Sequence, residues 1–190
     1  SNDDAIVTAL RALVVSNRSN YGVGSASLRL VHAKRFAGAG EQAASVYVYF
    51  RQVKDSLDVN GSELSFAVKI VNDRAVLMAQ TGRLFPQLDV ETGTTITDDR
   101  AFELIAERMG VTPEEVAQQL EFYQEKIVYS RGQWRHVRLY ISSGLPVVVA
   151  VDVNSSEVFR WDNRAGLRPA QPMRVMIQIR PRLGESPRAA

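Results

Sequence analysis

The sequence predicts an α+β fold in which a helix followed by antiparallel strands occurs twice. Apolar residues recur at helical spacing near the N-terminus and again around residue 100. Each of these segments precedes strand-like runs that are separated by short turns. Strands joined by such turns are expected to be antiparallel. Residues 1–86 and 96–162 are therefore predicted to form two similar units, each a helix packed on a curved antiparallel sheet.

The first unit begins with a predicted helix over residues 4–15, whose apolar stripe consists of Ile6, Leu10, Leu13 and Val14. Residues 17–26 are rich in Ser, Asn and Gly, and this composition indicates a loop. Alternating and β-branched residues then predict strands at 28–33, 46–50, 63–71 and 74–84. Asn72-Asp73 predicts a hairpin turn between the last two strands. Pro86 ends the ladder because proline has no N–H to donate.

The second unit is predicted to begin with two helices after a polar link at residues 87–95. Thr97 and Gly110 suit the N- and C-terminal caps of the first helix. Thr112-Pro113-Glu114-Glu115 gives the second helix an N-cap, a proline at the first position and a capping-box glutamate. The buried side of that helix is predicted to consist of Val116, Leu120 and Tyr123. Strands are then expected at 126–130, 134–141, 145–153 and 157–161.

The composition is that of a globular chain, with 45% apolar and 23% charged residues among 190. No apolar run approaches the length that a transmembrane helix needs, so no membrane span is expected. The sequence pI of about 9.0 raises the question of a nucleic-acid partner. However, residues 160–190 hold seven arginines against two carboxylates, and the rest of the chain is mildly acidic. The charge therefore gathers in a terminal segment and not on a folded face, so no nucleic-acid partner is expected.

The residues that most catalytic and metal sites require are scarce. Cysteine is absent, which excludes a disulfide, a thiolate zinc site and a cysteine nucleophile. The two histidines, His32 and His136, occur in no metal-binding spacing and are predicted to lie on strand surfaces. Asp152 follows an apolar strand, where it is either a general base or, as we favour, a turn residue that bonds its own backbone. We therefore expect no catalytic residue, no metal and no cofactor.

A motif in the first half is more specific than these single residues. Phe50-Arg51-Gln52 is followed by Ser56-Leu57-Asp58-Val59, by Gly61-Ser62-Glu63-Leu64, by a hairpin, and by Gly82-Arg83-Leu84-Phe85-Pro86. This order resembles the fungalysin/thermolysin propeptide (FTP) domain, although Ser56 and Asp58 stand where that family usually has Gly and Pro. The resemblance implies structural or partner-contact roles for Phe50, Gln52, Val59, Gly61 and Gly82. Because a glutamine amide within a sheet needs hydrogen-bond partners, Gln52 is expected to link two elements.

The second half resembles a PepSY domain, the usual companion of the FTP domain. The matching segments are Ile127-Val128-Tyr129, the strand from Trp134 to Tyr140, and Val151-Asp152-Val153-Asn154-Ser155-Ser156-Glu157-Val158. The two resemblances imply an FTP-like domain at 1–90, a PepSY-like domain at 91–162 and a basic, partly flexible segment at 163–190, with Asp152 on a matched position. The two domains are expected to be cystatin-like units.

Proteins of this architecture are mostly prosegments of secreted zinc metalloproteases of the thermolysin and fungalysin types. The resemblance implies a non-catalytic prosegment, secreted or in the cell envelope after removal of a signal peptide, that inhibits the protease domain in cis or in trans and assists its folding. Residues 163–172 are suited to lying in a protease cleft, and residues 173–179 to adding a strand. A free-standing secreted binding or regulatory module of the same type is the first alternative. The second is an enzyme of unrecognised type with a polar pocket lined by carboxylates such as Asp152 or Glu157.

Overall fold

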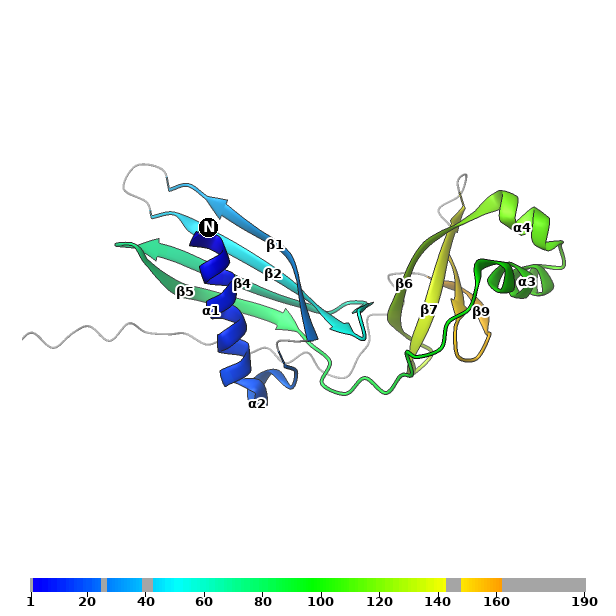
Figure 1. Ribbon diagram of the computed structural model, residues 1–190, viewed down its shortest axis with the longest axis horizontal. Helices are drawn as coiled ribbons and strands as arrows, with labels where there is room; N and C mark the ends of the chain where they lie inside the picture. The colour runs from blue at the N-terminus through cyan, green and yellow to red at the C-terminus, as the bar shows by residue number, and fades with distance from the viewer. Residues whose placement is uncertain (1, 25–26, 39–42, 143–147, 162–190) are drawn as a thin grey trace, which may run out of the picture.

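The computed structural model describes residues 2–24, 27–38, 43–142 and 148–161. In these residues the chain has an α+β fold with four helices and one large mixed sheet of nine strands (Figure 1). The helices are α1 (Asn2–Ser16), α2 (Arg18–Tyr21), α3 (Asp98–Met109) and α4 (Pro113–Gln119). The strands are β1 (Leu28–Phe36), β2 (Ser45–Lys54), β3 (Leu57–Val59), β4 (Glu63–Val71), β5 (Arg74–Arg83), β6 (Leu120–Ser130), β7 (Gln133–Ser142), β8 (Val148–Asp152) and β9 (Val158–Trp161).

Two lobes lie side by side along the long axis of the molecule (Figure 1). The first lobe holds α1, α2 and strands β1, β2, β4 and β5, and the second holds α3, α4 and strands β6 to β9. The strand order is β5-β4-β2-β3-β6-β7-β8-β9, and β1 also pairs with β2. The short strand β3 therefore connects the two lobes.

The first lobe is built by packing α1 on one face of its sheet. Ile6, Leu10 and Val14, which recur at helical spacing, are buried in one cluster with side chains of β2 and β4. The strand residues of this cluster are Val46, Val48, Phe50, Leu64, Phe66 and Val68. The predicted helix and the strands predicted after it are confirmed.

The predicted loop at residues 17–26 is wrong in part, because Arg18–Tyr21 form the short helix α2. The Asn17 side chain bonds a carbonyl of the last turn of α1 and marks the end of that helix. Gly22, with a φ of 69°, caps α2, and Tyr21 is buried. A single helical turn depends on such tertiary contacts, because it is not stable by propensity alone.

In the described part of the chain, three tight turns have both central residues in the left-handed region, and one of them is Arg131-Gly132 between β6 and β7. Asn72 and Asp73 have φ angles of 49° and 60°, which a two-residue hairpin of the primed type needs, so the predicted hairpin of β4 and β5 is confirmed. Asp55 and Ser56, with φ angles of 50° and 71°, make the turn between β2 and β3. The position of Ser56 favours glycine, which the FTP motif usually has there.

The two lobes meet at a short parallel pairing. Asp58 pairs with Lys126, and Val59 pairs with Ile127. Val59 and Ile127 are buried together with Phe85. The expectation of purely antiparallel sheets is wrong here. A short turn sets the direction only of strands that follow one another in the sequence, and the connection from β3 to β6 is long.

The two helices of the second lobe begin and end where their capping signals place them. The Thr97 side chain accepts a hydrogen bond from the N–H of Arg100, and the left-handed Gly110 caps the end of α3. Thr112 and Glu115 form the complete capping box of α4. The helices share one buried cluster with the sheet, which consists of Ala101, Leu104, Ile105, Ala106, Val116, Tyr140 and Val151.

Helix α4 is shorter than predicted, since it ends at Gln119 and Leu120 already belongs to β6. Val116 is buried as expected, but Tyr123 is 55% exposed, so its assignment to a buried helix face is corrected. The residues after Gln119 continue the helical spacing of apolar side chains. They are nevertheless extended, because they pair with β7.

The segment between the lobes, residues 84–97, has no regular structure but is fastened to both of them. Lys54 of the first lobe donates from Nζ to the carbonyl oxygen of Val90 at 2.6 Å. Asn154 of the second lobe donates from Nδ2 to the carbonyl oxygen of Glu91 at 2.9 Å. The predicted polar link is confirmed, and its path is fixed by side chains from each side.

The last three predicted strands correspond to β7, β8 and β9, with bounds that differ by a few residues. The predictions for residues 143–147, for the flexible segment at 163–172 and for a strand at 173–179 lie outside the described residues. Within the part of the chain that is described, no helix is long and apolar enough to cross a membrane.

Candidate functional site

Gln52 is a buried polar residue where the two lobes meet, with 2% of its surface exposed. Its Nε2 donates to the carbonyl oxygen of Phe85 at 2.8 Å, and its Oε1 accepts from the N–H of Phe85, also at 2.8 Å. The amide thereby makes the two hydrogen bonds that the backbone of a paired strand would make. The expectation that Gln52 links two elements is confirmed, since it fastens β2 to the segment after β5. We call this region the joint. It also includes β3, residues 60–62 and the facing part of β6.

Residues 60–62 form a turn that leads the chain from β3 into β4. Ser62 Oγ donates to the carbonyl oxygen of Val59 at 2.7 Å and accepts from the N–H of Gln52 at 3.0 Å. Gly61 has a φ of 76°, a conformation that strains other residues. β3, which precedes this turn, pairs with β2 on one edge and with β6 on the other.

Gly82 and Phe50 of the same motif are structural residues of the first lobe. A Cβ on Gly82 would lie 2.7 Å from the carbonyl oxygen of Glu63, so β5 approaches β4 this closely only at a glycine. Phe50 is 1% exposed, and its ring meets that of Phe66 edge-on at 6.0 Å. Of the residues that the resemblance singled out, the structure brings together at the joint Gln52, Val59 and Gly61.

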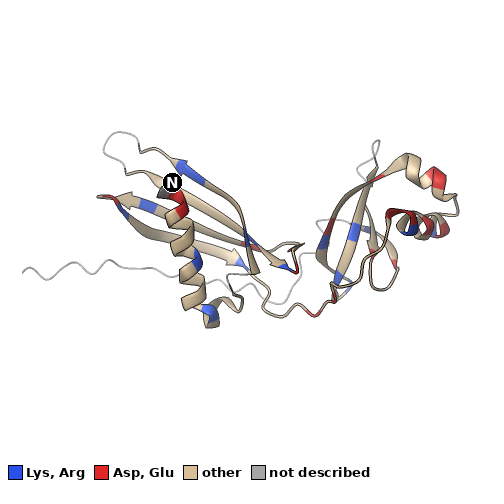
Figure 2. Cartoon of the chain, viewed as in Figure 1, with Lys and Arg blue, Asp and Glu red and all other residues tan. Residues whose placement is uncertain are grey.

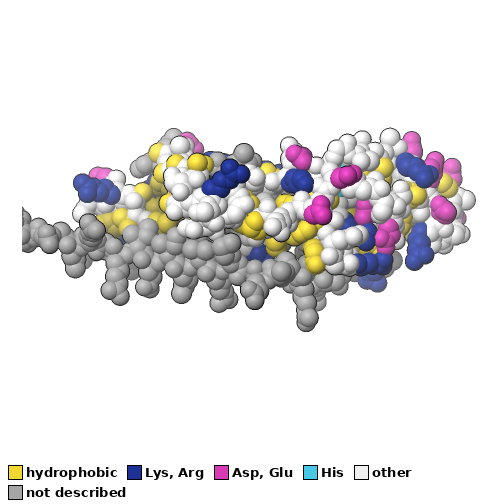
Figure 3. Space-filling view, turned by 90° about the horizontal axis from the view of Figure 1, so that it is seen from below, with side chains coloured by type: hydrophobic (Ala, Val, Ile, Leu, Met, Phe, Trp, Pro, Cys, Tyr) yellow, Lys and Arg dark blue, Asp and Glu magenta, His cyan; other side chains and the backbone are white. Residues whose placement is uncertain are grey.

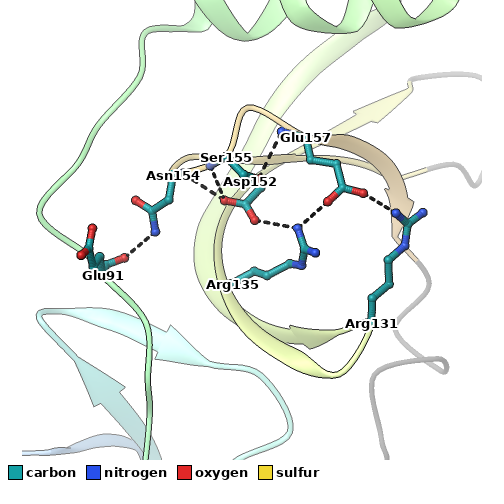
Figure 4. Close-up of polar contacts among 7 residues, drawn as sticks. All are labelled: Glu91, Arg131, Arg135, Asp152, Asn154, Ser155 and Glu157. Carbon is teal, nitrogen blue, oxygen red and sulfur yellow. Dashed lines mark hydrogen bonds and ion pairs between the residues drawn. The ribbon is translucent and has the colours of Figure 1, made fainter.

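Asp152 lies in the second lobe, at the turn between β8 and β9 (Figure 4). Its Oδ1 accepts from the N–H groups of Asn154 at 2.9 Å and Ser155 at 3.1 Å, which confirms the predicted turn. Its Oδ2 accepts from Arg135 Nη1 at 2.8 Å, and the same nitrogen lies 2.6 Å from Glu157 Oε2. Both oxygens of Asp152 are thus engaged, in a turn and in an ion pair that the sequence did not indicate.

This ion pair is buried, because the side chains of Arg135 and Asp152 are 7% and 5% exposed. Removing one member of such a pair leaves a charge in a medium that solvates it poorly. Asn154, in the turn that Asp152 stabilises, also reaches the carbonyl of Glu91 in the link (Figure 4). The contacts of Asp152 therefore fix the β8–β9 hairpin and one end of the segment between the lobes.

A second polar network lies on the side of the second-lobe sheet that α3 covers. His136 is 1% exposed, so its predicted place on a strand surface is wrong, and its Nε2 lies 2.5 Å from Glu125 Oε1. Arg138 bonds both Glu125 and Asp98, and the Tyr140 hydroxyl donates to Asp98 at 2.9 Å. Burial raises the pKa of Tyr140 to about 12. The local sequence predicts the strand but does not indicate that α3 packs over it. This polar network could therefore not be predicted from the sequence.

No helix of the described residues covers one face of the first-lobe sheet. The buried side chains of β2 face α1, and strand alternation turns Tyr47, Tyr49 and Arg51 to the opposite side, which we call the outer face. Tyr47 is 50% exposed and Phe36 is 45% exposed, and their rings meet edge-on at 5.4 Å. His32 is exposed as predicted, and its ring stacks on that of Tyr49 at 5.4 Å.

Three concavities follow one another from the outer face to the joint. Their volumes are 450, 350 and 480 Å³. The first two share His32 and Tyr47, and the last two share Tyr49. The path starts at the exposed Phe36 and ends among charged residues at the joint, where Figure 2 marks basic positions in blue at the end of β5 and on β6. Aromatic and arginine side chains of this kind are enriched in protein interfaces.

The second lobe presents a different surface. Seen from below, its acidic and basic side chains are interspersed (Figure 3). Among the residues that the structure describes, no group of three His, Asp or Glu side chains is arranged to hold a metal ion. Comparison with known proteins finds no family model, no curated protein and no solved structure that matches this chain.

Proposed function

We propose that this chain is a non-catalytic prosegment that binds a secreted zinc metalloprotease, inhibits it and assists its folding. The observation that carries the proposal is the outer face, where exposed aromatic side chains line a path toward the joint. Contiguous exposed apolar patches on a folded domain mark sites of interaction. The resemblance of the joint residues to the FTP motif supports a protease as the partner.

The proposal includes a finer description of the fold. Each lobe is a cystatin-like unit, with an FTP-like domain at 1–90, a PepSY-like domain at 91–162 and a basic segment at 163–190. Support comes from the repeated order of helix and strands, and from the two separate clusters in which α1 and α3 pack on their sheets. The chain acts outside the cytosol, in the secreted fraction or the cell envelope, where such proteases act.

Binding alone accounts for both activities. A prosegment that binds the native protease and not its unfolded form stabilises the native form by mass action, by about 4 kcal/mol at a free concentration about a thousandfold above Kd. Occupation of the active-site cleft excludes substrate by steric overlap. Neither effect requires an acid, a base or a metal from this chain.

The test measures inhibition and refolding. A panel of thermolysin-like proteases, with any that is encoded beside this gene, is assayed for peptide hydrolysis in the presence of increasing amounts of the chain. Each denatured catalytic domain is also refolded with and without it. We expect inhibition followed by slow cleavage of the chain, and a higher yield of refolded enzyme, for at least one protease. The absence of all three effects across the panel refutes the prosegment function and favours a free-standing binding module.

Two matched variants locate the surface. Tyr47→Glu places a charge on the outer face, and Met109→Glu places one at the end of α3, where the methionine is 58% exposed. Both sites are open enough to accept a charge without unfolding. We expect Tyr47→Glu to weaken inhibition and Met109→Glu to leave it unchanged. Equal effects of the two variants would show that the outer face is not the binding surface.

A further inference from the structure

The concavity at the joint collects positive charge from strands that are distant in the sequence. Arg51 comes from β2, Arg83 from the end of β5 and Lys126 from β6, and the acidic residues in the lining are Asp58 and Glu63. We call this 480 Å³ concavity the cationic groove. It is open to solvent. Tyr49, which is half-buried, and Tyr123, which is exposed, also line it.

The fold neutralises only part of this charge. Asp58 forms ion pairs with Arg29 and with Arg51, the latter at 3.5 Å. In the part of the chain that is described, no carboxylate forms an ion pair with Arg83 or with Lys126. The Nζ of Lys126 instead lies over the ring of Trp161, 4.8 Å from its centroid. Among the described residues Arg83 is therefore without an ion-pair partner, and Lys126 has only the Trp161 ring and the more distant attraction of Asp58 to balance its charge.

Lys126 is held where its own charge is unfavourable. It is only 9% exposed, and burial lowers its pKa, with a further lowering from the positive charge of Arg51 that the Asp58 carboxylate offsets in part. Like charges that converge on one cavity repel one another unless an anion lies between them. Asp58 already lies beside Arg51 and Lys126, but it also pairs with Arg29, so a further anion bound in the groove would reduce the remaining repulsion.

We propose that the cationic groove binds a carboxylate side chain within an acidic peptide segment of a partner protein. Three cations stand against two carboxylates in its lining, which suits a single negative charge better than a phosphate dianion. The planar fork of an arginine such as Arg83 matches the two oxygens of a carboxylate. The identity of the partner as a protease rests on the proposed function, whereas the affinity for an acidic peptide does not.

The shape of the groove favours a peptide over a small free anion. Tyr123 is 55% exposed at its rim and offers an apolar surface to the methylene groups of a bound segment. Asn60 and Gln124 line the same concavity, and their amides are suited to bonding the backbone of an extended peptide. The groove also continues along the outer face through Tyr49, so a longer segment has a path away from the charged end.

The test uses fluorescence anisotropy with the full chain. The probe is a labelled peptide of alternating Glu and Gly, and the control probe has Gln in place of each Glu. We expect the acidic peptide to bind and the neutral peptide not to bind. Arg83→Gln and Lys126→Met should each weaken binding about tenfold, the scale of one charge pair in a partly buried site. Arg74→Gln, at the opposite and exposed end of β5, removes the same charge and should weaken binding less than about twofold.

Three results of these measurements would overturn the inference. Equal affinity for the two peptides, or equal losses in Arg83→Gln and Arg74→Gln, would overturn it, because the groove would then add nothing to general charge. Inorganic phosphate that displaces the acidic peptide more strongly than free glutamate does would assign the site to phosphate and overturn the carboxylate. If Lys126→Met strongly lowers the midpoint of thermal unfolding, that variant is set aside. The binding affinity of Arg83→Gln, which changes a half-buried residue, then decides the test alone.

The same variants separate this inference from the proposed function. Protease inhibition that is unchanged in Arg83→Gln, together with no binding of the acidic peptide, refutes the groove and leaves the prosegment function intact. Binding of the peptide without inhibition of any protease keeps the groove and refutes the prosegment function.

Discussion

Replacing Gln52 by leucine tests how the two lobes are joined. The substitution removes both hydrogen bonds to Phe85 and leaves its N–H and carbonyl without partners, although Phe85 is only 8% exposed. Each unsatisfied buried backbone group costs about 1–3 kcal/mol. The apolar surface of the leucine offsets about 1 kcal/mol of this loss. We therefore expect the free energy of unfolding to fall by about 3 kcal/mol in Gln52→Leu.

The assay is urea denaturation followed by tryptophan fluorescence. Trp134 of the second lobe packs against the ring of Phe85 at 4.8 Å, so its emission reports on the joint. Gln133→Leu, at an exposed position beside that tryptophan, is the matched control and should change the free energy of unfolding by less than about 0.5 kcal/mol. A loss in Gln52→Leu that does not exceed the loss in the control would refute the reasoning.

Gln52→Glu gives the same test a pH dependence. A protonated carboxyl can still accept from the N–H of Phe85 and donate to its carbonyl, whereas a carboxylate is buried against that carbonyl oxygen. The pKa of the introduced carboxyl is therefore raised in the folded state above its unfolded value of about 4.3. The stability of the variant relative to the wild type should be highest below that pH and fall as the pH rises through the folded pKa. A difference that does not depend on pH would contradict this account.

Three further predictions concern other residues of the two lobes. Gly82→Ala should lower the free energy of unfolding by about 1–3 kcal/mol because its Cβ would lie 2.7 Å from a carbonyl oxygen, whereas Gly93→Ala, in open space, should have little effect in the same urea titration. Asp152→Asn keeps the turn acceptor but removes the charge that Arg135 binds, and should cost about 2 kcal/mol, since that arginine keeps a second carboxylate; no measurable loss would mean that the pair adds no stability. Tyr140, with a pKa raised to about 12, should titrate well above an ordinary tyrosine in the ultraviolet difference between the wild type and Tyr140→Phe. The stability that it contributes should be lost as the pH rises from about 10 to about 12, and a transition near pH 10 would count against its burial.

Elements with local start and stop signals could be predicted from the sequence. The capping box at Thr112, the left-handed cap at Gly110 and the hairpin turn at Asn72-Asp73 all formed as expected. Each of these signals is a hydrogen bond or a backbone preference within a few residues. A short window of sequence therefore contains all the interactions that decide the local structure.

Features that depend on distant pairing could not be predicted in this way. Tyr123 has helical spacing from Val116, but it lies in β6 at a register shift, between Phe122 and Gln124, which both pair with β7. His136 alternates as a surface residue would, yet it is 1% exposed and its ring lies against Glu125 of the neighbouring strand β6. The parallel pairing of Val59 with Ile127 has no local signature at all.

The candidate site likewise has one part that the sequence indicated and one part that it did not. The resemblance to the FTP motif drew attention to Gln52 and Gly61, because a motif records positions whose backbone geometry or hydrogen bonds are special. It gave no indication of the cationic groove. Arg83 and Lys126 belong to different lobes and share a cavity only because the joint brings β5 and β6 together.

The parallel pairing also has a kinetic consequence. It closes a chain loop of roughly 70 residues between Val59 and Ile127, whereas the other strand pairs join segments that follow closely in the sequence. We therefore expect each lobe to acquire its core before the two lobes dock. During synthesis the first lobe can be complete while the second is still emerging from the ribosome. A slow refolding phase in the fluorescence of Trp134, which lies against Phe85 across the joint, would then report the docking of two lobes that are already folded.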